Sequence, residues 1–300
     1  MGLDWRKSIV SVDQFTTESI AEIFQLADKA PRASHVLTGK TLTNLFYEPS
    51  TRTSSSFHAA MSKLGGDVIP INEVHYSSVS KGETLEDTIR TLACYSDVIV
   101  LRHGSDDATE RAVSVSEVPI INAGNGRGEH PTQALLDLYS IYCEHGRLDN
   151  LTVTLMGDLK NGRTVHSLSK LLRMYDCKVQ FVSPPSLSIP KKYLHPEDRI
   201  YNELGDAITS TDVLYITRVQ EERFFRPLEV DVSYTVTSSD MRRAKNDMIL
   251  LHPLPRVGEV PEEIDSDPRA AYFRQVKYGL YLRMALLLEI LLLPEMLNRA

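Results

Sequence analysis

The chain has 300 residues, 42% of them hydrophobic and 24% charged, which is typical of a soluble globular protein large enough to form two domains. The formal net charge of −7 argues against nucleic acid as a partner, and no apolar stretch is long enough to span a membrane. The N-terminus lacks the features of a signal peptide and the three cysteines form no CxxC pair, so we expect a cytoplasmic protein with reduced thiols.

Short apolar runs alternate with helical patterns along the whole chain, which predicts an α/β fold. In the first half we expect strands at 41–46, 67–71, 98–101 and 119–122, and helices near 16–28, 52–64, 84–95 and 106–114. In the second half we expect strands at 152–156, 178–182, 213–216 and 248–251, and helices near 164–174 and 202–210. A helix over 131–145, with Leu135, Leu138 and Tyr142 on one face, joins the halves. The pattern therefore predicts two doubly wound parallel-sheet domains with the active site in the cleft between them.

The segment after the first expected strand, Tyr-Glu-Pro-Ser-Thr-Arg-Thr at 47–53, has the residues of an anion site. It places Ser50, Thr51, Arg52 and Thr53 at the start of a helix. Free backbone N–H groups and the positive end of the helix dipole attract an anion there, and an arginine can donate two hydrogen bonds to it. An ordinary helix cap needs only one hydroxyl. We therefore interpret this segment as a phosphate site.

Two further polar segments follow strands of the first half. Arg102 ends the strand near 98–101, where an arginine is about as often a surface ion-pair partner as a ligand contact. The glycine-rich loop 124–129 leads to His130 and Gln133 at a helix start, where the pair could hold a carbonyl and an amide. A histidine before proline at a helix start is also often a cap or packing residue, so these residues leave both interpretations open.

Three segments of the second half also end strands. Residues 157–164, Gly-Asp-Leu-Lys-Asn-Gly-Arg-Thr, resemble the phosphate loop GxxxxGK[ST], but Arg163 replaces its lysine and we favour a carboxylate contact. Arg218 and Gln220 alternate after the strand 213–216, so both could address one carboxylate. The segment His-Pro-Leu-Pro-Arg at 252–256 contains two prolines and fixes its backbone carbonyls, although a simple turn is the alternative.

Taken in order, six segments resemble the catalytic chain of the aspartate transcarbamoylase family, within the aspartate/ornithine carbamoyltransferase superfamily. They are STRT at 50–53, RH at 102–103, HPTQ at 130–133, GDLKNGRT at 157–164, TRVQ at 217–220 and HPLPR at 252–256, with SSVSKGETL at 77–85 and AYFRQ at 271–275 in addition. The resemblance spans nearly the whole chain. It implies transfer of the carbamoyl group of carbamoyl phosphate to L-aspartate, giving N-carbamoyl-L-aspartate and phosphate for pyrimidine synthesis. It also implies that the enzyme needs no metal and no organic cofactor.

The resemblance also implies the domains and a role for each site residue. Residues 1–131, joined by a C-terminal helix at about 275–300, would bind carbamoyl phosphate, and residues 132–274 would bind aspartate. Arg52, Arg102, His130 and Lys81 would be catalytic. The carbamoyl-phosphate site would consist of Ser50, Thr51, Arg52, Thr53, Arg102, His130, Gln133, Ser77 and the backbone carbonyls of Leu254 and Pro255. The aspartate site would consist of Lys81, Arg163, Arg218 and Gln220.

In this family the loop that carries the lysine comes from a neighbouring subunit of a trimer, so the resemblance implies a homotrimer with shared active sites. Ser77 lies four residues before Lys81, and spacing alone leaves Ser78 as an alternative. The resemblance also covers chains that associate with a regulatory chain and chains fused to other pathway enzymes. One departure is Gly104, which stands where many members have proline after the Arg-His pair.

Two other functions are compatible with parts of this pattern. Ornithine carbamoyltransferases share the phosphate site and the HPTQ loop, but they have a His-Cys-Leu-Pro turn and a tryptophan-bearing loop for the amine side chain. This chain has the turn HPLPR and a single tryptophan, Trp5. Its TRVQ segment presents a cation, which is the wrong sign for the ammonium of ornithine. A catalytically silent assembly domain is the second alternative, although no site residue is replaced.

Overall fold

The structure is a computed structural model that describes residues 4–72, 82–126, 128–218 and 234–297, with side chains described to residue 292. The chain divides into two compact units, and each is described by itself. Unit 1 comprises Met1–Leu135 and Tyr278–Ala300, and unit 2 comprises Leu136–Lys277. Two helices run from one unit into the other, namely α5 (Pro131–His145) and α9 (Tyr272–Leu297).

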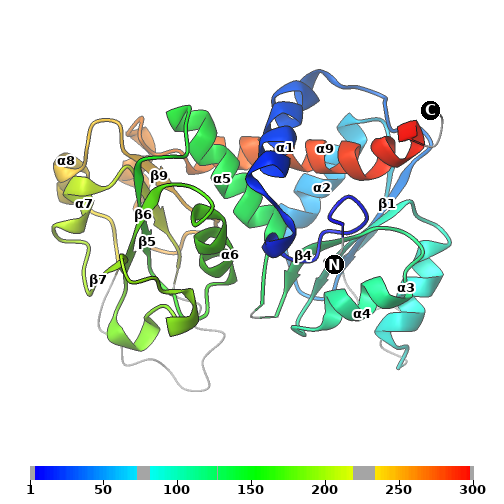
Figure 1. Ribbon diagram of the computed structural model, residues 1–300, viewed down its shortest axis with the longest axis horizontal. Helices are drawn as coiled ribbons and strands as arrows, with labels where there is room; N and C mark the ends of the chain where they lie inside the picture. Colours follow the sequence, from blue (N-terminus) through cyan, green and yellow to red (C-terminus); the bar gives the residue numbers. More distant parts are fainter. Residues whose placement is uncertain (1–3, 73–81, 127, 219–233, 298–300) are drawn as a thin grey trace. The chain divides into compact units, whose positions relative to one another are not determined.

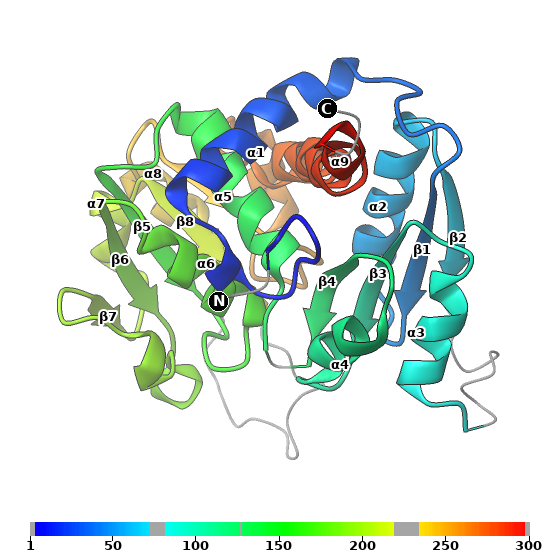
Figure 2. The same ribbon diagram turned by 45° about the vertical axis from the view of Figure 1, so that its right-hand side comes forward.

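Unit 1 is built on a parallel sheet with the strand order β2-β1-β3-β4 (Figures 1 and 2). Its strands are β1 (Thr41–Phe46), β2 (Asp67–Ile71), β3 (Val98–His103) and β4 (Ile120–Asn125). Its helices are α1 (Thr17–Lys29), α2 (Thr51–Lys63), α3 (Leu85–Ala93) and α4 (Ala108–Val115), with short 3-10 turns at Val12–Gln14 and Ala30–Arg32. Helices α2 and α3 lie on opposite faces of this sheet, as Figure 2 shows, because the right-handed crossovers β1-α2-β2 and β2-α3-β3 run in opposite directions across it.

Alternation along β3 determines where its polar residues point. Ile99 and Leu101 are buried in a cluster with residues of α3 and α4, so this face of the strand is covered by these two helices. Because successive side chains of a strand point to opposite faces, Arg102 belongs to the face on which α2 lies. The next residue, His103, belongs again to the face of α3 and α4.

Unit 2 contains a second parallel sheet with the strand order β7-β6-β5-β8-β9. Its strands are β5 (Leu151–Met156), β6 (Cys177–Val182), β7 (Arg199–Tyr201), β8 (Val213–Ile216) and β9 (Ile249–Leu251). Its own helices are α6 (Arg163–Leu172), α7 (Ala207–Ser210) and α8 (Ser238–Arg243), with 3-10 turns at Pro185–Leu187, Lys191–Tyr193 and Glu262–Ser266. Helices α7 and α8 cover one face of this sheet and α5 and α6 the other (Figure 1).

The predicted fold class is confirmed, because each unit is an α/β unit and every strand pair of the described residues is parallel. Two elements were not predicted, the strand β7 and the helix α8, and both are short. The three apolar positions on one face of α5 differ in burial. Leu135 and Leu138 on α5 are fully buried, whereas Tyr142, one turn beyond Leu138 on the same face and near the end of the helix, is 37% exposed. No helix within the described ranges is both long and apolar enough to cross a membrane.

Candidate functional site

The site of unit 1 lies at the point where the direction of chain progression in the sheet reverses. The chain leaves β1 for β2 on one side, whereas β3 lies on the other side of β1 and is followed by β4. In open parallel sheets, ligands bind beyond the carboxyl ends of the strands at such a switch point. Ser50 follows β1 and Arg102 is the last residue but one of β3, so both lie at this place.

The start of α2 has the geometry of an anion site. Ser50 is the N-cap of α2, its backbone is not helical (φ −157°, ψ 78°), and its hydroxyl makes no capping hydrogen bond. The next two residues, Thr51 and Arg52, are exposed, whereas Thr53 is buried. Backbone N–H groups of a first helical turn have no intrahelical acceptor, and here no capping hydroxyl of the N-cap accepts from them. This arrangement favours an anionic ligand.

Arg102 joins the two loops at the switch point. Its Nη1 lies 3.4 Å from the hydroxyl of Ser50 and 3.5 Å from the carbonyl oxygen of Ala123. Its Nε lies 3.3 Å from Oε2 of Glu48, and the Arg102 side chain is only 16% exposed. The structure therefore brings the predicted residues Ser50 and Arg102 together. Glu48 was not singled out in the sequence, although it directly precedes the Pro-Ser-Thr-Arg segment that was.

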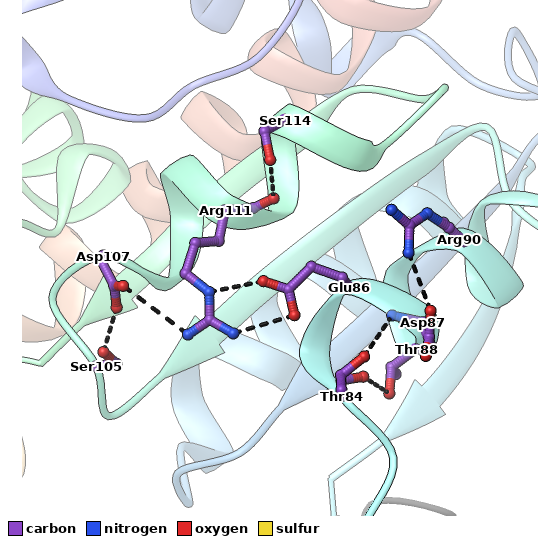
Figure 3. Close-up of polar contacts among 9 residues, drawn as sticks. All are labelled: Thr84, Glu86, Asp87, Thr88, Arg90, Ser105, Asp107, Arg111 and Ser114. Atoms are coloured by element: carbon purple, nitrogen blue, oxygen red, sulfur yellow. Dashed lines mark hydrogen bonds and ion pairs between the residues drawn. The ribbon is translucent and has the colours of Figure 1, made fainter.

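The loop after β3 is fixed by side-chain contacts (Figure 3). Arg111 on α4 donates two hydrogen bonds, of 2.7 and 3.0 Å, to Glu86 on α3, and Arg111 lowers the pKa of Glu86 to about 2. Asp107 accepts a hydrogen bond from the hydroxyl of Ser105 and lies 3.8 Å from Nη1 of Arg111. The Ser105 backbone N–H donates to Nδ1 of His103 at 2.9 Å, and burial lowers the pKa of His103, which keeps this nitrogen able to accept.

The loop after β4 is bonded to the loop after β3. Nδ2 of Asn125 donates to the carbonyl of Asp106 at 2.5 Å, and Oδ1 of Asn125 accepts from the N–H of Glu129 at 2.9 Å. Gly126 has a φ of +39°, and a Cβ there would lie 2.9 Å from the backbone carbonyl oxygen of Gly104, so both the backbone conformation and the available space favour glycine. This loop leads to His130, which is 4% exposed and whose carbonyl accepts from the N–H of Gln133 at 3.0 Å. The segments that carry Arg102 and His130 are thus held in one arrangement.

Unit 2 has its own switch point, between β5 and β8, because β6 lies on the other side of β5. Arg163 is the first residue of α6 after β5 and is 5% exposed. Gly157 in the same loop has a φ of +115°, and a Cβ there would lie 2.1 Å from the carbonyl oxygen of Thr217, which follows β8. Arg218 is the next residue. The loops that carry Arg163 and Arg218 are therefore packed directly against each other.

The turn after β9 is the third loop at the carboxyl ends of the strands of this sheet, because β9 neighbours β8. Its Leu254–Pro255 peptide bond is cis, and Leu254 has a φ of 56°, which is uncommon for a residue with a side chain. The N–H of Leu254 donates to Nδ1 of His252 at 2.7 Å. Arg256 donates to both carboxylate oxygens of Asp265, one of them at 2.6 Å, and lowers the pKa of Asp265 to about 2. The backbone of the turn is therefore constrained at both ends.

Three predicted site residues, Ser77, Lys81 and Gln220, lie outside the described residues, as does the alternative Ser78. The other predicted residues fall into two sets, each in loops or helix starts that follow the carboxyl ends of the strands of one sheet. Within the described ranges, no three His, Cys, Asp or Glu side chains are grouped as a metal site requires.

Known proteins resemble the chain over nearly its full length. Residues 7–143 match the carbamoyl-phosphate binding domain of the aspartate/ornithine carbamoyltransferase family, and residues 149–290 match its Asp/Orn binding domain. The aspartate carbamoyltransferase catalytic subunit of Clostridium botulinum (strain Okra) is 48% identical, with 95% of this chain and 98% of that protein aligned. The multifunctional protein URA2 of Saccharomyces cerevisiae is 50% identical over 94% of this chain, but the chain spans only 13% of its length.

Solved structures of aspartate transcarbamoylase from Trypanosoma cruzi have the same fold. The complex with carbamoyl phosphate is 46% identical with a TM-score of 0.91, and covers 95% of this chain and 96% of that chain. The complex with N-(phosphonacetyl)-L-aspartic acid is 47% identical with a TM-score of 0.89, and covers 95% of both chains. The sequence identities, the coverage and the two matched domains all indicate the same family. The chain belongs to the aspartate/ornithine carbamoyltransferase family.

Proposed function

We propose that this chain transfers the carbamoyl group of carbamoyl phosphate to the amino group of L-aspartate, giving N-carbamoyl-L-aspartate and phosphate, as its named relatives do. The observation that carries the proposal is the contact of Arg102 with Ser50, the N-cap of α2 that makes no capping bond. It joins a guanidinium to a helix start at the switch point of a parallel sheet. These are the two features that bind a phosphate group.

Unit 1 would bind the phosphoryl donor. The backbone and hydroxyls of Ser50, Thr51 and Thr53 with Arg52 hold the phosphate, and Arg102 reaches the phosphate and the carbonyl oxygen. His130 donates to the same carbonyl, while Gln133 and the backbone carbonyls of Leu254 and Pro255 accept from the carbamoyl NH2. This assignment corresponds to a carbamoyl-phosphate-binding domain of residues 1–131 with about 275–300. Residues 132–274 would form the aspartate-binding domain.

Charge development explains why cations are needed at these positions. When the amine of aspartate attacks the carbamoyl carbon, negative charge grows on the carbonyl oxygen, and phosphate leaves with roughly two negative charges. Arg52, Arg102 and His130 address these oxygens. Loss of one such donor typically costs ~10²- to 10³-fold in rate. We expect the leaving phosphate, rather than a side chain, to accept the proton of the attacking amine.

The second substrate is selected by charge. Arg163 and Arg218 present guanidinium groups from two loops in direct contact, and together with Gln220 they would bind the two carboxylates of aspartate. Their contribution is orientation, because they place the nitrogen without taking part in bond breaking. The ammonium of ornithine would be repelled at this position. Aspartate is therefore favoured over ornithine as the acceptor.

The assembly is part of the same proposal. Lys81, with Ser77 or Ser78, would reach the site of a neighbouring subunit, so the active form would be a homotrimer with shared sites. The proposed location is the cytoplasm. The relatives include free-standing catalytic subunits and multifunctional proteins, so a regulatory chain or fused pathway domains are compatible with this chain.

A phosphate-release assay tests the function directly. The protein is mixed with carbamoyl phosphate and either aspartate or ornithine, and inorganic phosphate is measured over time. We expect turnover with aspartate and none above background with ornithine. Turnover with ornithine alone would contradict the proposal, and the absence of turnover with both would favour a silent assembly domain. The native mass of the same sample tests the trimer, because an active monomer is incompatible with a shared Lys81.

A further inference from the structure

Unit 2 contains a hydrogen-bonded series of buried polar side chains to which no role has yet been assigned. Its members come from α5, β8, the turn after β9 and the start of α9, and all are less than 10% exposed. They are Asp137, Tyr215, His252, Glu259 and Gln275. Buried polar groups at such low exposure are costly unless each finds a partner, so their partners are informative.

The hydrogen bonds of these side chains connect α5 to the turn. Nε2 of Gln275 donates to Oδ1 of Asp137 at 2.6 Å, and Oδ2 of Asp137 accepts from the Tyr215 hydroxyl at 2.8 Å. Oε1 of Gln275 accepts from the backbone N–H of His252 at 2.9 Å. Gln275 therefore bridges a side chain of α5 and the backbone at the beginning of the turn.

The imidazole of His252 extends this series of hydrogen bonds to Leu254. Because its Nδ1 accepts from the N–H of Leu254 at 2.7 Å, the ring proton lies on Nε2, which donates to Oε1 of Glu259 at 2.7 Å. Oε2 of Glu259 accepts in turn from the N–H of Val257 at 2.9 Å. Both ends of the turn are thus attached to this ring and its carboxylate partner, and the orientation of the Leu254 carbonyl depends on them.

At its other end, this series of hydrogen bonds is fixed at a specific place on α5. Asp137 follows Gln133 by four residues within α5, so both side chains lie on the same face of that helix. Gln133 and the carbonyls of Leu254 and Pro255 are the groups proposed above to bind the carbamoyl NH2. Gln275 thereby attaches the turn to the helix that carries Gln133. It is the last residue of the AYFRQ segment, to which the sequence alone assigned no role.

We propose that Gln275 is a positioning residue for recognition of the carbamoyl amide, acting through Asp137 on α5 and through the backbone N–H of His252. The inference rests on the proposed function, since it concerns the amide of the same substrate. Gln275 itself does not touch the substrate in this proposal. Its side chain determines where the Leu254 and Pro255 carbonyls lie relative to α5. The measurable consequence is selectivity for an amide over a methyl group of the same size.

Two unreactive ligands isolate that selectivity. Phosphonoacetamide has the amide of carbamoyl phosphate, and acetonylphosphonate has a methyl group in place of the NH2; both retain the carbonyl and an anionic phosphonate. Their dissociation constants are measured by calorimetry on the assembled protein. We expect the wild type to prefer the amide by about tenfold or more, as one or two additional hydrogen bonds imply. A general loss of stability would weaken both ligands together and leave this ratio unchanged.

The central variants first break one hydrogen bond and then restore it with donor and acceptor exchanged. Gln275→Glu places a carboxylate against Asp137, which we expect to reduce the preference to within about threefold. In the double variant Asp137→Asn, Gln275→Glu the bond forms again in the reverse direction, because the introduced asparagine can donate to the introduced carboxylate and still accept from Tyr215. That carboxylate also still accepts from the N–H of His252. We expect the double variant to recover most of the preference.

A matched control is available in the same unit. Gln180 on β6 is 3% exposed and bonds to Thr154 and Ser210, away from the turn, so Gln180→Glu introduces the same change at an equally buried position. We expect it to retain the wild-type ratio. Circular dichroism melts establish that each variant is folded. If Gln275→Glu does not fold, Gln275→Met carries the test, since it breaks both bonds without adding a charge.

The outcomes separate the inference from the proposed function. An unchanged ratio in a folded Gln275 variant overturns the inference, and so does a double variant no better than Gln275→Glu or a wild type without amide preference. A preference lost in the single variant, kept in Gln180→Glu and regained in the double variant supports it. Failure of the proposed function has a different signature, because the wild type would then release no phosphate from carbamoyl phosphate and aspartate.

Discussion

Replacement of Arg102 by alanine should abolish most of the activity while leaving the fold intact. The contacts of this side chain with Ser50, Glu48 and the carbonyl of Ala123 are 3.3 to 3.5 Å long, beyond the usual 2.7 to 3.2 Å for such bonds. Each long contact contributes only a fraction of the ~1 kcal/mol of a typical hydrogen bond, so we expect the loss of all three to lower the unfolding free energy by about 1 kcal/mol. For a domain of this size that corresponds to a decrease of about 2–4 °C in Tm.

The catalytic effect of the same change should be much larger. The guanidinium addresses oxygens on which charge develops, so its loss should reduce kcat by ~10²- to 10³-fold, or about 2.7–4 kcal/mol in the barrier. Arg102→Lys should be intermediate, because lysine keeps the charge without the planar fork. The assay is initial-rate phosphate release at saturating carbamoyl phosphate and aspartate, accompanied by thermal melts of each variant.

The control for this prediction is Arg90→Ala, which removes an exposed arginine paired with Asp87 on α3 and should change neither kcat nor Tm appreciably. The reasoning is refuted if folded Arg102→Ala keeps kcat within about threefold of wild type, a difference far below that of a lost transition-state donor. It is also refuted if the loss of activity follows entirely from a large decrease in Tm.

Three other changes test the second unit. Arg218→Ala should raise KM for aspartate by about 100-fold or more, because it loses a charge-assisted bidentate contact, and calorimetry should show unchanged carbamoyl phosphate binding. The reverse pattern would exclude a role of Arg218 in binding aspartate. Arg173→Leu should lower the urea-derived unfolding free energy by about 3–5 kcal/mol, because it removes the charged partner of Asp198. The Asp198 side chain is 1% exposed and accepts hydrogen bonds of 2.6 and 2.7 Å from Arg173, and a cost below 1 kcal/mol would contradict this. Asp265 has its pKa lowered to about 2 by hydrogen bonding to Arg256, below the 3.8 of the unfolded chain, so its contribution is present above pH 4 and lost as pH falls toward 2. Because Asp265 is about one-third exposed, Asp265→Asn should cost only about 1 kcal/mol at pH 5 and about a third of that at pH 2.5, and a difference independent of pH in urea titrations would refute this.

The long periodic elements could be predicted because their signals are local. The strand at 41–46 and the helix at 131–145 were predicted with the bounds that the structure shows, since each has a clear apolar period and a proline or glycine at its limits. The strand β7 was missed because its three residues are mostly exposed and depend on pairing with β6, which is a contact distant in sequence. The helix α8 is too short to show a helical period.

Local sequence patterns could not predict several features of the site. The acidic partner of Arg102, Glu48, became apparent only when β1 and β3 were placed side by side. The constraint on the loop after Gly104 comes from Arg111 and Glu86, on two helices whose packing no spacing rule predicts. Gln275 resembled any polar residue at a helix start until its two partners were known.

The sequence by itself determined the fold class, the family and the residues that carry charge at the strand ends, because these depend on residue type and on spacing along the chain. Only the tertiary structure decided which of these residues meet, since parallel strands adjacent in a sheet are distant in sequence. Ser50 and Arg102 are 52 residues apart along the chain, and Asp137 and Gln275 are 138 apart. Such contacts form because burial of the two sheets brings the strand ends together, and no local propensity contains that information.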